Sequence, residues 1–316
     1  MIFLFLDGVG LGEASAQNPF YEARAEFLPF YRGNLRLPDG TPVKPIDAVL
    51  GVEGLPQSAT GQTSLFTGEN LPKILNRHRD SYPNRQMRSI IKEKNLLRGL
   101  TAKGFRAVFI NAYPVYSRFF TRRHINIRPN GELHFSRYFP AEFQRRISVS
   151  TCMMVANGQT PFYEKDILAK RSVFQDYSNR WLIDKGLPLP EFSPVQAAEI
   201  LYQAAQHYDF LLYEYFQTDI YAHRRSYDDQ VQLIKDLNLL LGTLVSLLDP
   251  SRDTLVVTSD HGNLEDFSTR THTRNPVPLI VWGHRSNELR EAISSLTDVT
   301  PGIFAFFSSP SPWLTR

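Results

Sequence analysis

The sequence predicts an α/β fold in which a mostly parallel sheet is covered by helices on both faces. Short apolar runs recur along the 316 residues, and segments with helical spacing separate several of them. Strands that alternate with helices form parallel sheets, because each connection must cross over the sheet. The length fits one large domain that carries a smaller insertion.

Five apolar runs are predicted to be strands. The first, residues 2–6, ends at Asp7, which is the pattern of a buried strand that delivers a polar side chain to a loop. The other runs span residues 107–111, 210–215, 254–259 and 277–282. Open α/β sheets hold their sites beyond the carboxyl ends of the strands, so the functional residues are expected there.

Apolar residues three and four positions apart predict helices over residues 87–102, 194–206 and 227–248. Between about residues 113 and 194 this rhythm is lost, and aromatic residues alternate with arginines. We therefore expect a core made of residues 1–112 and 195–316. Residues 113–194 are expected to form an inserted cap that recognises the substrate.

Composition and charge exclude several classes of protein. Lys and Arg number 35 against 32 Asp and Glu, and a net charge of +3 indicates neither a nucleic-acid nor a membrane partner. No stretch approaches the 18 or so apolar residues that cross a bilayer. The apolar start lacks a basic segment, so we expect no signal peptide. Cys152 is the single cysteine, which favours a cytoplasmic location.

Two polar residues stand at points where chemistry can be placed. Asp7 follows the first predicted strand, and Ser58 stands at the start of a predicted helix. Taken singly, an Asp or Ser at such a point is usually a turn or helix-capping residue. A serine at a helix start can also be a nucleophile, since the free N–H groups and the helix dipole favour a phosphate oxyanion.

Acidic and histidine residues gather in the carboxy-terminal third. Asp219 and His223 are four residues apart, so on a helix they share one face and can bind one metal ion. Asp260 and His261 directly follow the strand at 254–259, and His272 precedes the last strand. An adjacent Asp and His at the end of a buried strand need partners to offset their burial.

Five segments, in this order, resemble motifs of the alkaline phosphatase superfamily. They are LDGVGLGE (6–13), QSATGQTSLFTG (57–68), TDIYAH (218–223), SDHGNLED (259–266) and THTRNPVP (271–278). The resemblance is strongest to the branch that contains cofactor-independent phosphoglycerate mutase and phosphopentomutase. It covers residues 1–112 and 195–316 and implies an alkaline-phosphatase-like core.

The resemblance implies two divalent metal ions and a serine nucleophile. One ion is expected on Asp219, His223 and His272. The other is expected on Asp7, Ser58, Asp260 and His261. Mixed Asp and His ligands suit Zn²⁺ or Mn²⁺, and two such ions about 4 Å apart can hold a transferring phosphoryl group. Ser58 would then form a phosphoserine intermediate.

Substrate-binding residues are predicted from charge and position. Seven arginines lie between Arg118 and Arg146 against two glutamates, so Arg118, Arg122 or Arg123 is expected to contact a substrate phosphate. A solvated basic face is the alternative. Further candidates for substrate contact lie in or near the nucleophile segment: Thr60, Gln62 and His78.

These observations together predict phosphoryl transfer through Ser58, with hydrolysis of a small phosphate ester as the reaction. Intramolecular transfer by a phosphomutase is the alternative. The mutases have a histidine four residues after the nucleophile and a much larger insertion, whereas this chain has Gln62. A metal-stabilised binding protein without turnover is a third possibility, which the full set of seven ligands argues against. The natural substrate, the native metal and the oligomeric state are left open by the sequence.

Overall fold

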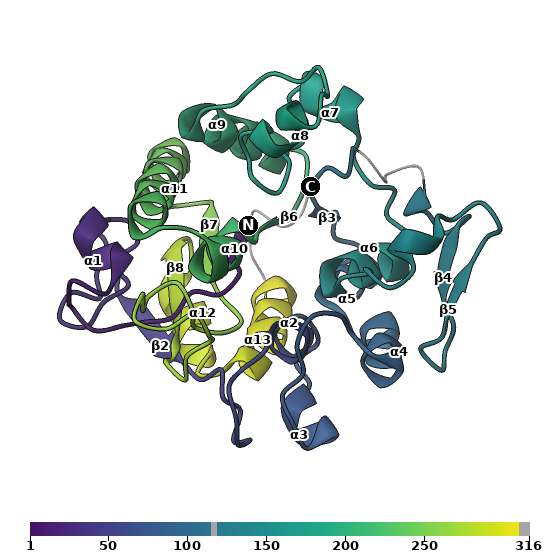
Figure 1. Ribbon diagram of the computed structural model, residues 1–316, viewed down its shortest axis with the longest axis horizontal. Helices are drawn as coiled ribbons and strands as arrows, with labels where there is room; N and C mark the ends of the chain where they lie inside the picture. The colour runs from purple at the N-terminus through teal and green to yellow at the C-terminus, as the bar shows by residue number, and fades with distance from the viewer. Residues whose placement is uncertain (115–118, 310–316) are drawn as a thin grey trace.

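The protein folds around a six-stranded, mostly parallel sheet, which confirms the predicted fold class (Figure 1). The computed structural model describes residues 1–114 and 119–309. The strand order across the sheet is β2-β8-β7-β1-β6-β3. In chain order these strands are β1 (Ile2–Leu6), β2 (Val43–Ile46), β3 (Ala107–Phe109), β6 (Phe210–Tyr215), β7 (Thr254–Thr258) and β8 (Val277–Gly283).

Strand β1 lies inside the sheet, parallel to β7 on one side and to β6 on the other, and β3 continues the parallel order beyond β6. The predicted strands at 2–6 and 210–215 match β1 and β6 to the residue. Both are buried on both faces, and apart from Glu214 in β6 both are apolar or aromatic throughout. Parallel pairing places the carboxyl ends of β1, β6 and β7 at the same edge of the sheet.

Strand β8 runs antiparallel to β7, and edge strand β2 runs antiparallel to β8. The predicted helix-and-strand alternation fails here, because no crossover helix separates β7 from β8. Residues 259–276 stay at the edge of the sheet where β7 ends, so the chain can only return in the opposite direction. Strand β2 was not predicted, because Lys44 and Pro45 interrupt its apolar pattern.

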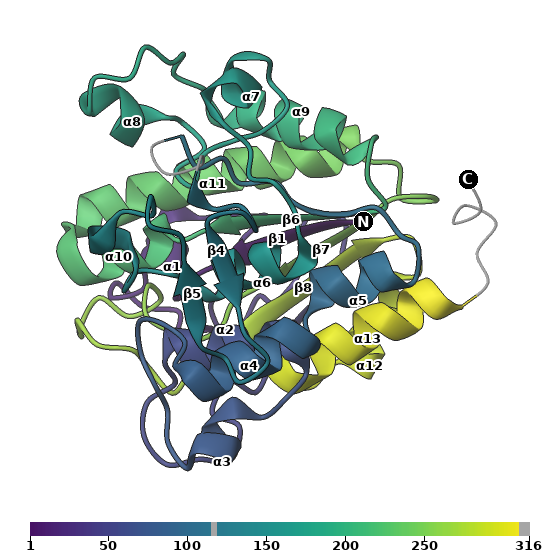
Figure 2. The same cartoon turned by 90° about the vertical axis from the view of Figure 1, so that its right-hand side faces the viewer.

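Side chains of β1 alternate between two core clusters. Leu4 and its neighbours at positions 2 and 6 belong to the cluster under α9 (Pro194–Ala205), α11 (Tyr227–Leu247) and α1 (Pro19–Ala23). Phe3 and Phe5 belong to the cluster on the opposite face. That face is covered by α2 (Ser58–Thr67), α5 (Leu96–Ala102), α12 (Ser286–Ala292) and α13 (Leu296–Ser308). Figure 2 shows α9 and α11 above the strands and α5, α12 and α13 below them.

The helix predicted over residues 87–102 is in fact two helices, α4 (Arg85–Glu93) and α5. The side chain of Asn95 accepts a hydrogen bond from the backbone N–H of Arg98 and caps the second helix. The apolar spacing continues across the break, so periodicity alone hides it. The other two predicted helices match α9 and α11 to within one residue at their ends.

Residues 113–194 hold the β4 (Ile125–Ile127) and β5 (Leu133–Phe135) ribbon and the short helices α7 (Glu164–Leu168) and α8 (Arg180–Asp184). They also hold α6 (Val149–Asn157), whose Cys152 and Met153 are fully buried in the same cluster as Phe3 and Phe5. Burial raises the pKa of the Cys152 thiol to about 12. The insertion is therefore packed into the core through α6, and its role as a substrate-recognising cap stays a prediction.

Among the helices of the described ranges, none combines the length and the apolar composition needed to cross a membrane.

Replacement of Phe66 by alanine should strongly destabilise the protein. Its buried ring packs edge-to-face on Phe3 and Phe5, with centroids 6.2 and 5.4 Å apart. We expect Phe66→Ala to lower the free energy of unfolding by about 3–5 kcal/mol, measured by chemical denaturation. Ile74→Ala, on the exposed side of α3 (Leu71–Leu75), is the control and should change it by less than about 0.5 kcal/mol. A loss below about 1 kcal/mol for Phe66→Ala would contradict this packing.

Candidate metal centre and substrate pocket

Three neighbouring strands bring the predicted metal ligands to one edge of the sheet. Asp7 follows β1, and Asp260 and His261 follow the adjacent strand β7. Strand β6, on the other side of β1, leads into α10 (Gln217–Arg224), which carries Asp219 in its first turn. The parallel register of these strands is the reason that residues more than 200 positions apart lie together.

Ser58 is the first residue of α2, beneath this edge. The side chain of Gln57 does not cap the helix, so it does not satisfy the backbone N–H groups at the helix start. A Cβ atom at Gly61 would lie 2.7 Å from the backbone oxygen of Asp260, so the glycine allows α2 to approach the loop after β7. The Oγ of Ser58 lies 3.0 Å from Nε2 of His261.

The first donor cluster consists of Asp7, Asp260 and His261, all buried. Nε2 of His261 lies 3.4 Å from Oδ1 of Asp7 and 3.5 Å from Oδ2 of Asp260. Within the described residues, these two oxygens have no hydrogen-bond partner. Buried carboxylate oxygens without donors are costly, so they point to a missing cation.

Electrostatics within this cluster support the same conclusion. Burial and the charge of Asp260 raise the pKa of Asp7 well above its usual range, and burial also raises the pKa of Asp260. Burial opposes protonation of His261, but the carboxylates of Asp260 and Asp7 outweigh it and raise its pKa to about 10. Without a cation, the two acids hold a proton on the imidazole. The mixed oxygen and nitrogen donors fit a divalent transition metal in its place.

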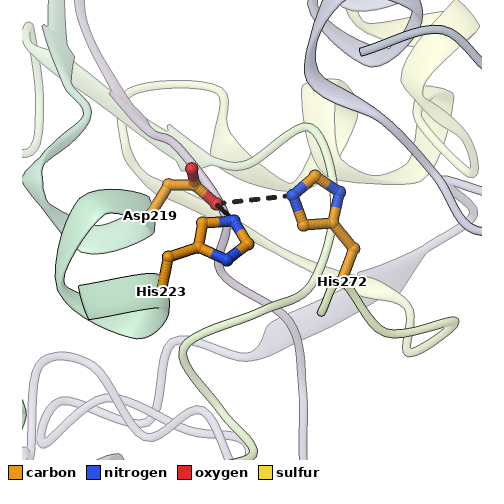
Figure 3. A group of neighbouring side chains, drawn as sticks. All are labelled: Asp219, His223 and His272. Carbon is orange, nitrogen blue, oxygen red and sulfur yellow. Dashed lines mark ion pairs between the residues drawn. The ribbon is translucent and has the colours of Figure 1, made fainter. Parts of the chain in front are cut away.

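The second donor cluster consists of Asp219, His223 and His272 (Figure 3). Oδ1 of Asp219 lies 3.4 Å from Nε2 of His223 and 3.6 Å from Nε2 of His272. Nδ1 of His223 lies 2.7 Å from the carbonyl oxygen of Arg270, and Nδ1 of His272 lies 2.8 Å from that of Pro56. Each Nδ1–H can thus donate to a carbonyl, which directs both Nε2 atoms toward the cluster. In the absence of a metal, Nδ2 of Asn263 lies 3.0 Å from Nε2 of His223.

The protonation states of this second cluster also fit metal binding. Burial and the charge of His261 lower the pKa of His272 to about 4, so its imidazole is neutral. Burial opposes ionisation of Asp219, but hydrogen bonds from His223 and Asn263 and the charge of His261 hold the pKa of its carboxyl well below the usual range. The rings of His261 and His272 stack with centroids 3.7 Å apart, so the two clusters adjoin.

Sequence reasoning missed two residues that hold the clusters in place. Glu265 accepts hydrogen bonds from the backbone N–H groups of Gly10 and Asn263, both at 2.8 Å, and from the hydroxyl of Thr273. It therefore joins the loops that carry Asp7, the Asp260 pair and His272. Asn263 donates to Oδ1 of Asp219 at 2.7 Å. Both stand inside the SDHGNLED segment, which was the available signal.

A pocket of about 680 Å³ opens above Ser58. Gln62, a predicted substrate contact, lines it and donates to Oδ2 of Asp7 at 3.2 Å. Thr60 and His78 do not line it. The hydroxyl of Thr60 donates to the backbone oxygens of residues 57 and 79. Nε2 of His78 lies 3.3 Å from the backbone oxygen of residue 52.

The predicted arginine contacts are placed differently from expectation. Arg122 donates to the carbonyl oxygens of Val155 and Ala156 and lines a separate cavity of about 470 Å³. Its side chain lies against Gly158, where a Cβ atom would be within 2.5 Å of the guanidinium. Arg123 is exposed and lies outside the lining of the large pocket, and Arg118 lies outside the described residues. The arginines that line the pocket are instead Arg146 and Arg224.

Comparison with known proteins places this fold and site. Residues 185–310 match the family model of the Metalloenzyme superfamily. One relative is the 2,3-bisphosphoglycerate-independent phosphoglycerate mutase of Pseudomonas fluorescens. It is 30% identical over 132 residues, which are 39% of this chain and 26% of the mutase. The corresponding mutase of Psychrobacter arcticus is 29% identical over 132 residues, 39% of this chain and 24% of the mutase. The matched segment thus spans about a quarter of these relatives.

The fold is similar to that of the alkaline phosphatase from the Antarctic bacterium TAB5, with a TM-score of 0.55, 14% identity and coverage of 96% of both chains. Together, the sheet, the two donor clusters and the family match resemble those of metalloenzymes of the alkaline phosphatase type. The family match covers residues 185–310, less than half of the chain, and agrees with the resemblance that the sequence motifs predicted.

Metal analysis tests the two clusters directly. After reconstitution with Zn²⁺ or Mn²⁺, we expect two divalent ions per chain by mass spectrometry, and about one in His272→Ala. Chelation should lower the melting temperature, because the buried carboxylates repel one another once the ions leave. His207→Ala, at an exposed histidine, is the control and should keep both ions. Fewer than one ion in the unaltered protein would rule out the assignment.

Proposed function

We propose that this protein is a metal-dependent phosphoryl-transfer enzyme that hydrolyses a small phosphate ester through Ser58. The observation that carries the proposal is the position of the Ser58 hydroxyl. It lies at the start of α2, 3.0 Å from His261, on the floor of the pocket that both donor clusters line. The family-model match over residues 185–310 and the phosphatase-like fold support the same chemistry.

Two ions would be held by this chain, Zn²⁺ or Mn²⁺ by the character of the donors. Asp219, His223 and His272 would hold one, and Asp7, Ser58, Asp260 and His261 the other. When bound, such ions lower the pKa of a coordinated hydroxyl and neutralise the charge of a transferring phosphoryl group. The proposal includes a cytoplasmic location, which rests on the single, buried cysteine.

The residues of the chain divide the reaction between them. The Ser58 hydroxyl loses its proton to solvent and its oxygen attacks phosphorus. The bond from phosphorus to the ester oxygen breaks, the alcohol leaves with a proton taken from water, and a phosphoserine forms. The N-terminal end of α2 faces the negative phosphoryl group, where the helix dipole and backbone N–H groups favour an anion. Gln62 keeps Asp7 in place through its amide and has no proton to exchange at neutral pH. Water then attacks the phosphoserine and releases phosphate.

Hydrolysis is favoured over transfer back to the substrate by the form of the pocket. Trp181 and Tyr82 line it and are still 41% and 40% exposed, so the mouth of the pocket is open to solvent. A mutase must exclude water while the phosphoserine persists. Phosphomutase activity is the second candidate, because the matched relatives are phosphoglycerate mutases.

Ser58→Ala should abolish turnover of any phosphate ester, by at least about 10³-fold, because the nucleophile is lost. The ion on Asp219, His223 and His272 should remain, as shown by metal analysis. Ser246→Ala, on the exposed side of α11, is the matched control and should retain activity. Activity close to that of the unaltered protein in Ser58→Ala would assign the nucleophile to another residue.

Water labelled with heavy oxygen distinguishes hydrolase from mutase. Incubation of the metal-loaded protein with sugar phosphates and phosphoglycerates should release inorganic phosphate that carries the label, because water attacks the phosphoserine. Mass spectrometry of the released phosphate measures it. Isomerised substrate without label would show that the protein is a mutase and would overturn the hydrolytic assignment.

A further inference from the structure

We propose that the organic part of the substrate carries a planar aromatic ring, such as a nucleobase, which binds between aromatic side chains of the pocket. The inference rests on the proposed function, because Ser58 would attack the phosphate of this ester. It adds the substrate class, which neither the family match nor the metal ligands specify.

Aromatic side chains form a large part of the pocket wall. Seven of the described lining residues have aromatic rings other than histidine: Tyr82, Tyr113, Phe120, Phe143, Phe174, Trp181 and Phe216. Aromatic surface binds the face of any planar ring, and it does so largely independently of the ring's substituents. A volume of about 680 Å³ lies within the range of sites that enclose drug-sized ligands, about 300–1,000 Å³.

The charges of the pocket argue against a second anionic group on the substrate. The described lining residues include two arginines, Arg146 and Arg224, against four acids. Of the acids, Asp7 and Asp219 belong to the donor clusters, whereas Asp80 and Glu214 lie outside them. Away from the metal ligands, the pocket thus offers aromatic surface without a surplus of positive charge. A neutral ring fits this wall better than a carboxylate or a second phosphate.

Two aromatic side chains stand at the mouth of the pocket and remain accessible. Trp181 and Tyr82 are 41% and 40% exposed although both line the pocket. Trp181 already stacks on the buried ring of Phe174, with centroids 5.9 Å apart and an angle of 22° between the planes. A further ring can join such a stack without rearrangement of the core.

The backbone holds both side chains in defined positions. Asp176 accepts hydrogen bonds from the N–H groups of Asn179 and Trp181, at 2.8 and 2.9 Å, and so fixes the start of α8. Asn179 has a φ of +65°, and Ser81, just before Tyr82, has a φ of +60°. L-residues other than asparagine seldom adopt this conformation, so the surroundings of Ser81 hold the backbone there.

The two side chains come from different parts of the fold. Trp181 lies in α8 and Tyr82 precedes α4, and both figures show α8 toward the top of the molecule and α4 toward the bottom. Both residues line the same pocket, so that pocket lies between these two elements. A ring that enters it can meet aromatic surface from either side.

Matched ester pairs test the inference. AMP and ribose 5-phosphate share the bond that is broken and differ in the nucleobase, and 2-phenylethyl phosphate and butyl phosphate differ in the phenyl ring. With the metal-loaded protein, we expect kcat/KM for AMP to exceed that for ribose 5-phosphate by about tenfold or more. A similar ratio for the second pair would show that any aromatic ring suffices, and a preference in the first pair alone would identify a nucleobase. Equal values within both pairs would overturn the inference.

Variants locate the effect. Trp181→Ala and Tyr82→Ala should each reduce the ratio of AMP to ribose 5-phosphate turnover severalfold, because the stacking surface is lost. Tyr138→Ala, at an exposed tyrosine outside the pocket, is the matched control and should leave the ratio unchanged. A fall in the turnover of both esters by the same factor in Trp181→Ala and Tyr82→Ala would contradict ring recognition at this site.

Binding separates this inference from the proposed function. Calorimetry with metal-loaded Ser58→Ala, which lacks the nucleophile, measures the affinity for AMP and for ribose 5-phosphate without consumption of either ester. Tighter binding of AMP without turnover would support ring recognition and reject the enzymatic proposal. Turnover of both esters without a preference for AMP in kcat/KM or affinity would support the enzymatic proposal and reject ring recognition. Absence of both would reject both.

Discussion

The structure depends on the burial of two carboxylates side by side at the carboxyl ends of two neighbouring strands of the sheet. Strands β1 and β7 pair in parallel with Phe5 opposite Thr258, so the residues just beyond them, Asp7 and Asp260, must emerge next to each other. The apolar strands gain stability only when they are buried, and this burial takes the acids out of water. A positive charge between them removes the conflict. Protonated His261 supplies it in the free protein, and a metal ion is the stronger alternative.

The arrangement of the loops follows from the same constraint. Glu265 receives hydrogen bonds from three segments and fixes the loops after β1 and β7 to the loop before β8. The loop that carries His272 lies at this edge, and β8 begins directly after it. The position of this loop therefore explains both the antiparallel direction of β8 and the location of His272. Donor atoms held by backbone N–H groups and by buried side chains move little, so the two clusters are organised before any ligand arrives.

The sequence predicted those parts of the molecule that local patterns determine. Apart from Glu214, strands β1 and β6 are apolar or aromatic runs, and the acids and histidines after the strands are visible as motifs. The break at Asn95 was missed because apolar spacing continues through it, and β2 was missed because an edge strand tolerates Pro45. The expected substrate contact of Arg122 was wrong in placement. Side-chain direction in an irregular insertion depends on tertiary packing, here on the space beside Gly158, which no local pattern encodes.

The connection between the insertion and the core decides how a substrate can be selected. Helix α6 shares a core cluster with β1, and its Ser150 donates to the buried carboxyl of Glu214 on β6 at 2.7 Å. Burial raises the pKa of Glu214 to about 7, so its carboxyl is partly protonated near neutral pH. Burying this carboxyl under α6 therefore costs less free energy than burying a full negative charge. An insertion attached in this way cannot move as a rigid body without disrupting the core. Trp181 on α8 and Tyr82 in the loop before α4 lie outside the core clusters at the mouth of the pocket, so under the proposed ring recognition they can contact a ligand without movement of α6.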